Sequence, residues 1–169
     1  MAHKNIVLAG FMGTGKSTIG RIVAERLGWR FVDTDALITD RTERSIAQIF
    51  TDDGEAGFRQ LEAVACCDAA AGCHCIIAVG GGALLDADVR ALFSERAVVI
   101  NLRCDLETIM SRVGHDPARP LFSMERERLA GLLASRAAHY DSLPHQIDTT
   151  HLSPQAVAEE VIRLWQQNR

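Results

Sequence analysis

The sequence lacks the features of several large classes of protein. Its 169 residues carry 22 acidic side chains against 18 from Lys and Arg, a net charge of −4, so no broad nucleic-acid surface is predicted. It contains no apolar run of membrane-spanning length, and its first ten residues lack the longer apolar region and cleavage site of a signal peptide. We therefore expect a cytoplasmic protein that binds neither nucleic acid nor membrane. No apolar surface stripe stands out either, so we expect a monomer.

The cysteines also lack the pattern of a disulfide framework, because there are five of them, an odd number in a short chain. Four cluster with a histidine in CCDAAAGCHC, residues 66–75, which raises the alternative of a zinc site. However, Cys66 and Cys67 are adjacent, and Cys73 and Cys75 are two apart, unlike the C-x2–4-C pairs of structural zinc sites. The spacing favours small buried thiols over a metal site.

Apolar runs and helical patterns alternate along the chain. Runs of strand length occur at 5–9, 31–33, 75–79, 97–102 and 145–148, and helical patterns at 16–27, 55–71, 87–93, 105–112, 124–140 and 154–166. Ser153 and Pro154 are typical of a helix N-cap and first turn. The alternation predicts an α/β fold, a parallel sheet covered by helices on both faces. We expect one domain over 1–169, with a charged segment at 34–62 and a loop at 113–122.

The stretch GFMGTGKST, residues 10–18, directly follows the first apolar run. It matches the phosphate-loop pattern G-x-x-x-x-G-K-[ST] in full, and glycines there let successive amides point at phosphate oxygens. Lys16 is expected to contact the β- and γ-phosphates of a nucleotide, and the Ser17 hydroxyl to ligate Mg2+. The sequence therefore predicts a nucleotide site, but does not by itself say what receives the phosphate.

The second predicted strand ends in acidic residues, in FVDTD at 31–35. Asp33 and Asp35 lie at i and i+2, so on an extended segment both project toward the carboxyl edge of the sheet. The run CIIAVGGG, where motors and switches usually carry the metal-associated acid, contains none. This pattern favours a small-molecule kinase, although a strand-end cap is an alternative interpretation of the two aspartates.

Arginines and glycines further along suggest an acceptor site. Arg59 and Glu62 are three apart on one helix face, so Glu62 could hold Arg59 in place for a carboxylate ligand. The GGG at 80–82 directly follows a strand, which indicates close approach of a ligand to the backbone. Arg136 lies one turn before Tyr140 and could be a second carboxylate clamp, or simply a solvated helix arginine.

In this order and spacing, GFMGTGKSTIGR, FVDTD, SIAQIF, GEAGFRQLE, AVGGGALLD, RPL and R-x-x-x-Y resemble the shikimate kinase family over about residues 5–165. The resemblance implies a P-loop NTPase three-layer sandwich with a five-stranded parallel sheet in order 2-3-1-4-5. It implies transfer of the γ-phosphate of ATP to the 3-hydroxyl of shikimate, in the pathway to chorismate and the aromatic amino acids. ATP and shikimate are the implied partners, and Mg2+ the implied cofactor.

The resemblance also assigns roles to residues. Catalytic roles fall to Lys16, Asp35 and Arg119, of which Arg119 belongs to a lid at 113–122, and metal binding falls to Ser17 and Asp33. The ATP contacts are Gly13, Thr14, Gly15, Lys16, Ser17, Thr18, Arg112 and Arg119. The shikimate contacts are Asp35, Arg59, Gly80, Gly81, Gly82 and Arg136, with 34–62 as the shikimate-binding segment.

Two other functions compete with this one. A kinase of the same fold acting on gluconate or another small hydroxy acid is the nearest alternative. A nucleotide-dependent switch without turnover is the second, and the sequence contains no sign of switch regions. The combination of Asp35, Arg59, the glycines at 80–82 and Arg136 favours shikimate as the acceptor.

Overall fold

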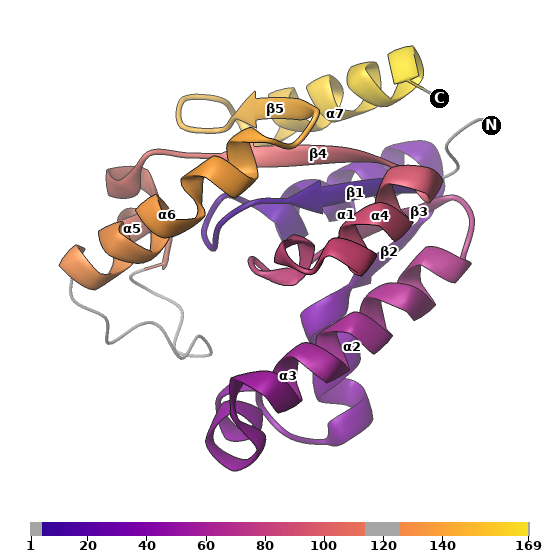
Figure 1. Cartoon of the computed structure of the whole chain (residues 1–169). Helices are drawn as coiled ribbons and strands as arrows, with labels where there is room; N and C mark the ends of the chain where they lie inside the picture. Colours follow the sequence, from indigo (N-terminus) through magenta and orange to yellow (C-terminus); the bar gives the residue numbers. More distant parts are fainter. Residues whose placement is uncertain (1–4, 114–125, 169) are drawn as a thin grey trace.

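A computed structural model describes residues 5–113 and 126–168 and shows a parallel sheet between two layers of helices (Figure 1). The strands are β1 (Asn5–Ala9), β2 (Arg30–Asp33), β3 (Cys75–Ala78), β4 (Ala97–Arg103) and β5 (His145–Asp148). They pair in the order β2-β3-β1-β4-β5, and every pairing is parallel. The predicted five-stranded sheet and its order are confirmed.

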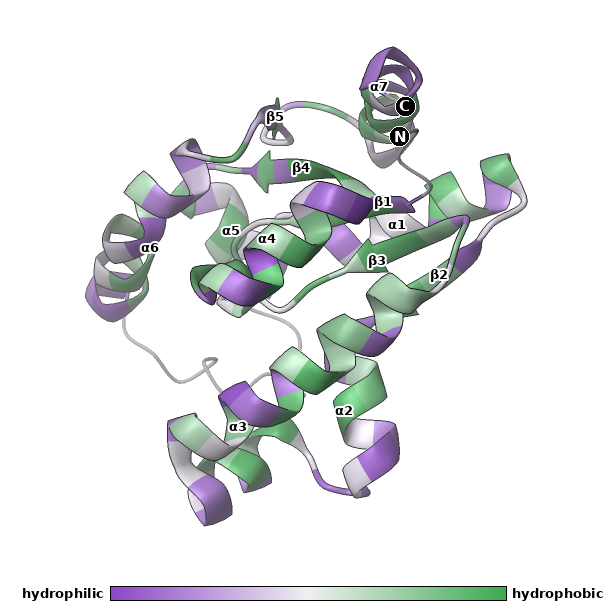
Figure 2. Ribbon diagram, turned by 45° about the vertical axis from the view of Figure 1, so that its right-hand side comes forward, coloured by the Kyte–Doolittle hydropathy of each residue, from purple (hydrophilic) through white to green (hydrophobic). Residues whose placement is uncertain are grey.

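The central strands are apolar on both faces because helices cover both sides of the sheet (Figure 2). Every residue of β1 and β3 is buried. One face packs against α1 (Lys16–Leu27) and α7 (Pro154–Asn168). The other packs against α3 (Ile46–Ala71), α4 (Ala87–Arg96), α5 (Leu106–Val113) and α6 (Arg126–Asp141), with the short 3-10 helix η1 (Ala83–Leu85).

The ends of several helices are set by local sequence. Gly28 ends α1 in a left-handed conformation, and Ser153 accepts a hydrogen bond from Ala156 N at the start of α7, as the sequence predicts. Ser45 and Gln48 form a reciprocal capping box at the start of α3. Gly54, with φ 71° and ψ −176°, then kinks α3. The predicted helix at 55–71 is therefore only the second part of α3.

The segment after β2 differs from the prediction. Thr34–Thr42 forms the helix α2, so Asp35 lies in a first helical turn and not on an extended strand end. Asp33 caps this helix, its side chain accepting hydrogen bonds from Asp35 N and Ala36 N. The prediction that both aspartates project from one extended segment is therefore wrong. The strand ends at Asp33, which is also the N-cap, and the helix begins at the next residue, Thr34.

The cysteine cluster is divided by the fold. Cys66 and Cys75 are buried, whereas Cys67 and Cys73 are exposed, so the expectation of buried thiols holds for only two of the four. In the described parts of the chain, no three His, Cys, Asp or Glu side chains form a group that could hold a metal ion. Within those same ranges, no helix combines the length and apolar character needed to cross a membrane.

Candidate active site

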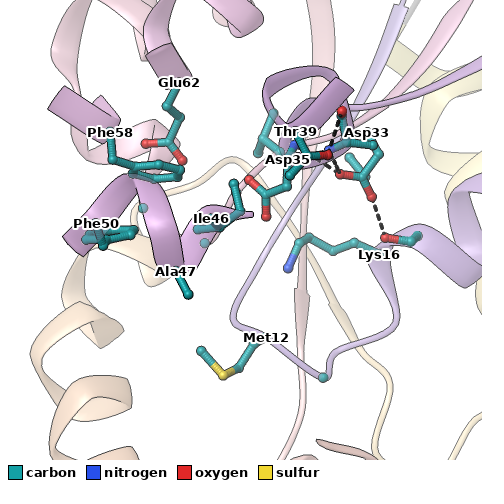
Figure 3. A pocket seen from close by; sticks show the side chains of 18 of the residues that line it. Met12, Lys16, Asp33, Asp35, Thr39, Ile46, Ala47, Phe50, Phe58 and Glu62 are labelled. Atoms are coloured by element: carbon teal, nitrogen blue, oxygen red, sulfur yellow. Dashed lines mark hydrogen bonds between the residues drawn. The ribbon is translucent and has the colours of Figure 1, made fainter. Parts of the chain in front are cut away.

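A large cavity opens at the carboxyl ends of the central strands and is lined by the loop that precedes α1 and by α2 and α3 (Figure 3). This edge of a parallel α/β sheet is the usual position of ligand sites, because helix N-termini meet there. Thirteen of the residues predicted from the sequence line this one cavity: Gly13, Gly15, Lys16, Ser17, Thr18, Asp33, Asp35, Arg59, Gly80, Gly81, Gly82, Arg112 and Arg136.

The loop before α1 has backbone conformations that require glycine. Gly10, Gly13 and Gly15 have φ values of 134°, 77° and 98°. A Cβ at Gly10 would lie only 2.2 Å from the carbonyl oxygen of Leu102, so this part of the loop packs directly on the end of β4. The Lys16 ammonium donates to the carbonyl oxygens of Gly10 and Phe11 at 2.7 and 3.0 Å. The loop is thus curled around the lysine that is predicted to meet the phosphates.

Ser17 and Asp33 lie together although they come from different elements. The Ser17 hydroxyl donates to Asp33 Oδ2 at 2.7 Å, a contact drawn in Figure 3. A hydroxyl and a carboxylate are hard oxygen donors of the kind that Mg2+ prefers. The residues present therefore fit a magnesium ion held at Ser17, with Asp33 close enough to act through a coordinated water.

Asp35 points into the cavity from the first turn of α2, on the side from which the Lys16 side chain also enters (Figure 3). Its helix is attached to the glycine segment, because the buried Thr34 hydroxyl accepts a hydrogen bond from Gly80 N at 3.2 Å. A Cβ at Gly80 would lie 3.1 Å from Asp35 Oδ1. Asp35 is therefore held between the predicted phosphate site and the three glycines.

Arg59 reaches the cavity from α3, beyond the kink. Its guanidinium donates to Glu62 through Nη1 and to Glu55 through Nη2, the latter at 3.3 Å. Burial acts against the charged guanidinium, but the two carboxylates outweigh it and raise the pKa of Arg59. A Cβ at Gly82 would lie 2.6 Å from both Nη1 and Nη2. Glycine at position 82 thus leaves the space that the guanidinium occupies.

The sequence predicts Glu62 only as the partner of Arg59, but in the structure Glu62 is also a buried acid, 3% exposed. Burial is the main reason that its carboxyl pKa is raised, and nearby Asp35 adds to this, while Arg59 and Arg136 oppose it. Glu62 Oε1 accepts no hydrogen bond from any residue that the structure describes. It lies 2.3 Å from where a Cβ of Gly80 would be. Glu62 is therefore a buried acid facing the cavity beside the predicted acceptor site.

Arg136 enters from α6, on the opposite side from α3. A Cβ at Gly81 would lie 3.3 Å from Arg136 Nη1 and 3.4 Å from the Tyr140 hydroxyl. That hydroxyl, buried with the rest of Tyr140, donates to the carbonyl oxygen of Gly81. Arg136 is thus not a solvated helix arginine, since Tyr140 ties its helix to the glycine segment and its side chain lines the cavity.

Arg112, at the end of α5, lies beside the phosphate loop at the edge of the cavity. Its guanidinium donates to the Thr149 carbonyl oxygen at 2.9 Å, to the Thr149 hydroxyl at 3.3 Å and to the Gly13 carbonyl oxygen at 3.4 Å. Thr149 in turn donates to the carbonyl oxygens of Thr14 and Arg103. The arginine therefore joins the phosphate loop to the segment after β5.

One predicted residue that the structure describes, Thr14, does not line the cavity. Thr14 is 1% exposed, and its hydroxyl donates to the Phe11 carbonyl oxygen, so its side chain stabilises the loop from behind. Arg119 and residues 114–122 of the predicted lid lie outside the described residues, and their roles stay predictions from the sequence.

The sequence interpretation missed an aromatic wall. The rings of Phe50 and Phe58 stack with centroids 4.6 Å apart, and both line the cavity beside Ile46 and Ala47 (Figure 3). The Arg59 guanidinium lies 5.4 Å from the Phe58 ring centroid. In the sequence, the only sign of this wall is that two of the six phenylalanines lie four residues before and four residues after Gly54. The kink at Gly54 in α3 is what brings the two rings together.

Known proteins share this chain's sequence pattern and fold. The family model for shikimate kinase matches residues 12–166. The shikimate kinase of Geobacter sulfurreducens is 42% identical over 160 residues, covering 94% of this chain and 88% of its own. A structure of the shikimate kinase from Acinetobacter baumannii in complex with shikimate is 34% identical, with a TM-score of 0.92, covering 99% and 95% of the two chains.

A gluconokinase from Sinorhizobium meliloti shares only the fold, with 17% identity and a TM-score of 0.66. By contrast, the range matched by the shikimate kinase family model, residues 12–166, contains Lys16, Arg59, the glycines at 80–82 and Arg136, which line the cavity. The chain belongs to the shikimate kinase family and is a kinase.

Proposed function

We propose that this chain transfers the γ-phosphate of ATP to the 3-hydroxyl of shikimate, giving shikimate 3-phosphate and ADP. One observation carries the proposal. Arg59 and Arg136, on opposite sides of the glycines at 80–82, face one cavity whose other end is the phosphate loop. Two guanidiniums suit a carboxylate, which accepts paired hydrogen bonds from each planar fork. The shikimate-bound structure of a relative supports this choice of acceptor.

The proposed chemistry requires mainly positioning and neutralisation of charge. The acceptor oxygen forms a bond to the γ-phosphorus while the bond from that phosphorus to the β,γ-bridging oxygen breaks. The proton of the acceptor hydroxyl is taken up by the Asp35 carboxylate or by water. A carboxylate is a weak base for an alcohol, so positioning of the hydroxyl is the larger part of the role of Asp35.

Lys16 has a separate role at the phosphates. It exchanges its contacts with the loop carbonyls for contacts with the β- and γ-oxygens, where its charge stabilises the transition state. Bound Mg2+ supplies further neutralisation of the phosphate oxygens, with Ser17 as its ligand and Asp33 as the partner of Ser17. Arg112 and Thr149 mark the side from which the base of the nucleotide enters.

Glu62 acts as a positioning residue in this proposal, since it holds the Arg59 guanidinium in the orientation needed by the carboxylate. The Phe50 and Phe58 wall would cover the apolar face of the acceptor ring.

All of these residues come from one chain, so we propose a monomer acting as a single domain. We further propose a place in the pathway to chorismate and the aromatic amino acids.

A coupled assay of ADP release tests the proposal, with shikimate, gluconate or no acceptor present at equal concentration. We expect release that depends on Mg2+ and on shikimate, and a product phosphorylated at the 3-oxygen as located by NMR. Faster turnover with gluconate would assign the chain to the nearest alternative. Absence of turnover with either acceptor, despite nucleotide binding, would favour a switch.

A further inference from the structure

Thr149 is a buried residue directly after β5 that contacts the phosphate loop from behind. It is 1% exposed and does not line the large cavity. Its hydroxyl donates to the Thr14 carbonyl oxygen at 3.1 Å, although the two residues are 135 positions apart in the chain. The phosphotransfer proposed above gives this hydroxyl no task.

The neighbours of the Thr149 hydroxyl decide where its single proton goes. Two carbonyl oxygens lie within reach, those of Thr14 and Arg103, each at 3.1 Å. The Arg103 oxygen already accepts a hydrogen bond from Thr149 N at 2.8 Å. Because that oxygen has a donor, directing the hydroxyl proton to Thr14 satisfies both carbonyls. The hydroxyl oxygen in turn accepts a hydrogen bond from Arg112 Nη1 at 3.3 Å.

The contact to the Thr14 carbonyl also fixes the direction of an amide. That carbonyl and the Gly15 N–H belong to one peptide unit, which is planar and trans, so the N–H points opposite to the carbonyl. Since the carbonyl is directed to Thr149, the Gly15 N–H is directed away from it, and Gly15 lines the large cavity. Gly15 has a φ of 98°, and glycine leaves the backbone free to turn here. Thr149 therefore restricts a peptide unit that glycine alone would not hold.

Thr149 holds a second part of the loop through Arg112. The Arg112 guanidinium donates to the Thr149 carbonyl oxygen through Nη2 at 2.9 Å and to its hydroxyl through Nη1. Nη1 also donates to the Gly13 carbonyl oxygen at 3.4 Å. Two consecutive loop carbonyls are thus connected to one buried residue, directly at Thr14 and through the guanidinium at Gly13.

We propose that Thr149 is a positioning residue for the nucleotide phosphates, whose hydroxyl orients the peptide unit of Thr14 so that the Gly15 N–H meets a phosphate oxygen. The inference rests on the proposed use of ATP, since it requires a phosphate in the loop. Successive backbone amides of such loops are the donors that hold a phosphate. An amide that is already oriented loses less freedom when the phosphate binds. Removal of the hydroxyl should therefore weaken nucleotide binding and leave shikimate binding unchanged.

Thr149→Val and Thr149→Ser separate the hydroxyl from the rest of the side chain. Valine keeps the shape without the hydroxyl, whereas serine keeps the hydroxyl and loses a methyl group. Isothermal titration of the full-length chains with ADP and Mg2+ should show about a tenfold loss of affinity in Thr149→Val and less than about a threefold loss in Thr149→Ser. Shikimate affinity should match that of the parent in both. Equal losses in the two variants, or parent ADP affinity in Thr149→Val, would overturn the proposal.

The Gly15 amide reports its own orientation by NMR. In the 15N-labelled parent, ADP with Mg2+ should move the Gly15 amide proton downfield, because a phosphate oxygen is a charged acceptor, and the shift should be smaller in Thr149→Val. Thr150→Val is the matched control, since within the described residues the Thr150 hydroxyl contacts Asp105 N and the Cys104 sulfur but no loop carbonyl. It should keep the parent ADP affinity. A Gly15 amide in the parent that does not respond to ADP, or an equal loss of affinity in Thr150→Val, would contradict the proposal.

Turnover of shikimate, measured on the same proteins, separates this inference from the proposed function. A parent chain that transfers no phosphate to shikimate, with the expected effects of Thr149→Val on ADP binding, would contradict the proposed function and support the role of Thr149. A parent that phosphorylates shikimate, with unchanged ADP affinity in Thr149→Val, would contradict the role of Thr149 alone.

Discussion

Gly82 lies directly against the guanidinium of Arg59, so that a Cβ at position 82 would be 2.6 Å from both Nη1 and Nη2. The backbone of Gly82 has a negative φ that alanine can adopt. Gly82→Ala should therefore displace the guanidinium, which is the end of a flexible side chain, and leave the backbone in place. We expect shikimate affinity to fall about tenfold, while the free energy of unfolding changes by less than about 1 kcal/mol.

Isothermal titration with shikimate and chemical denaturation measure the two effects of Gly82→Ala. Gly131→Ala is the matched control, because a Cβ there would meet nothing within 4 Å. It should leave affinity unchanged and stabilise α6 by about 0.5–1 kcal/mol. Full shikimate affinity in Gly82→Ala would show that the space at position 82 does not position Arg59.

Substitution of either cavity arginine by lysine tests the proposed carboxylate clamp. A charged hydrogen bond is worth about 1.5–3 kcal/mol, so Arg59→Lys and Arg136→Lys should each weaken shikimate binding by roughly tenfold to a few hundredfold. Lysine cannot reproduce the planar fork. Affinity for ADP with Mg2+ should barely change. Arg41→Lys, which alters an exposed arginine paired with Asp68, is the control. Loss of ADP binding with intact shikimate binding would contradict the assignment.

Lys16→Ala should abolish turnover and leave the fold intact. The ammonium lines the cavity and is held by the Gly10 and Phe11 carbonyls, so the core does not depend on it. Loss of those two contacts should cost no more than about 1–3 kcal/mol of stability. Steady-state turnover at saturating ATP and circular dichroism provide the measurements. A variant with near-normal turnover would exclude the proposed role at the phosphates.

The buried Glu62 carboxyl predicts a pH-dependent stability. Burial raises its pKa above the ordinary value of 4.5, so the folded state binds the proton more tightly than the unfolded chain. The stabilising contribution is present below pH 4.5 and is lost as pH rises through the folded-state pKa. Because glutamine resembles the protonated carboxyl and does not titrate, the free energy of unfolding of Glu62→Gln should rise relative to that of the parent as pH increases from 4.5 to 7.

Urea denaturation of both proteins at several pH values measures this difference. Glu55→Gln is the control, since it removes an exposed carboxylate that pairs with the same guanidinium. Its free energy of unfolding should change with pH as that of the parent does. If the free energy of unfolding of the parent and of Glu62→Gln changed equally with pH, the buried carboxyl would not be the source of the pH dependence.

The cysteine cluster is predicted to bind no structural metal. Cys66 and Cys75 are buried while Cys67 and Cys73 are exposed, so the four thiols do not share one environment. Elemental analysis of protein purified without chelator should find no stoichiometric zinc. Zinc that is lost together with stability when a chelator is added would contradict the prediction.

Local patterns were sufficient for much of the fold. The phosphate loop, the strand positions and the N-cap of α7 each depend on residues close in sequence, and the structure has them where the patterns predict. The family resemblance added the strand order, which no local pattern contains. The segment 34–54 was not foreseen as helical, because Gly54 and the charged residues interrupt the apolar period that a helix normally shows.

The sequence by itself determined which chemical groups this protein has: a phosphate loop, one acid at the end of β2 and another two residues later, three consecutive glycines and two arginines in helices. Only the tertiary structure decided what surrounds them. Packing between elements buries Glu62. The stacking of Phe50 on Phe58 joins the two sides of the kink in α3, and the Tyr140 contact to Gly81 joins two different elements. Burial and long-range contact depend on how elements pack, and packing is a property of the whole chain that short sequence patterns do not record.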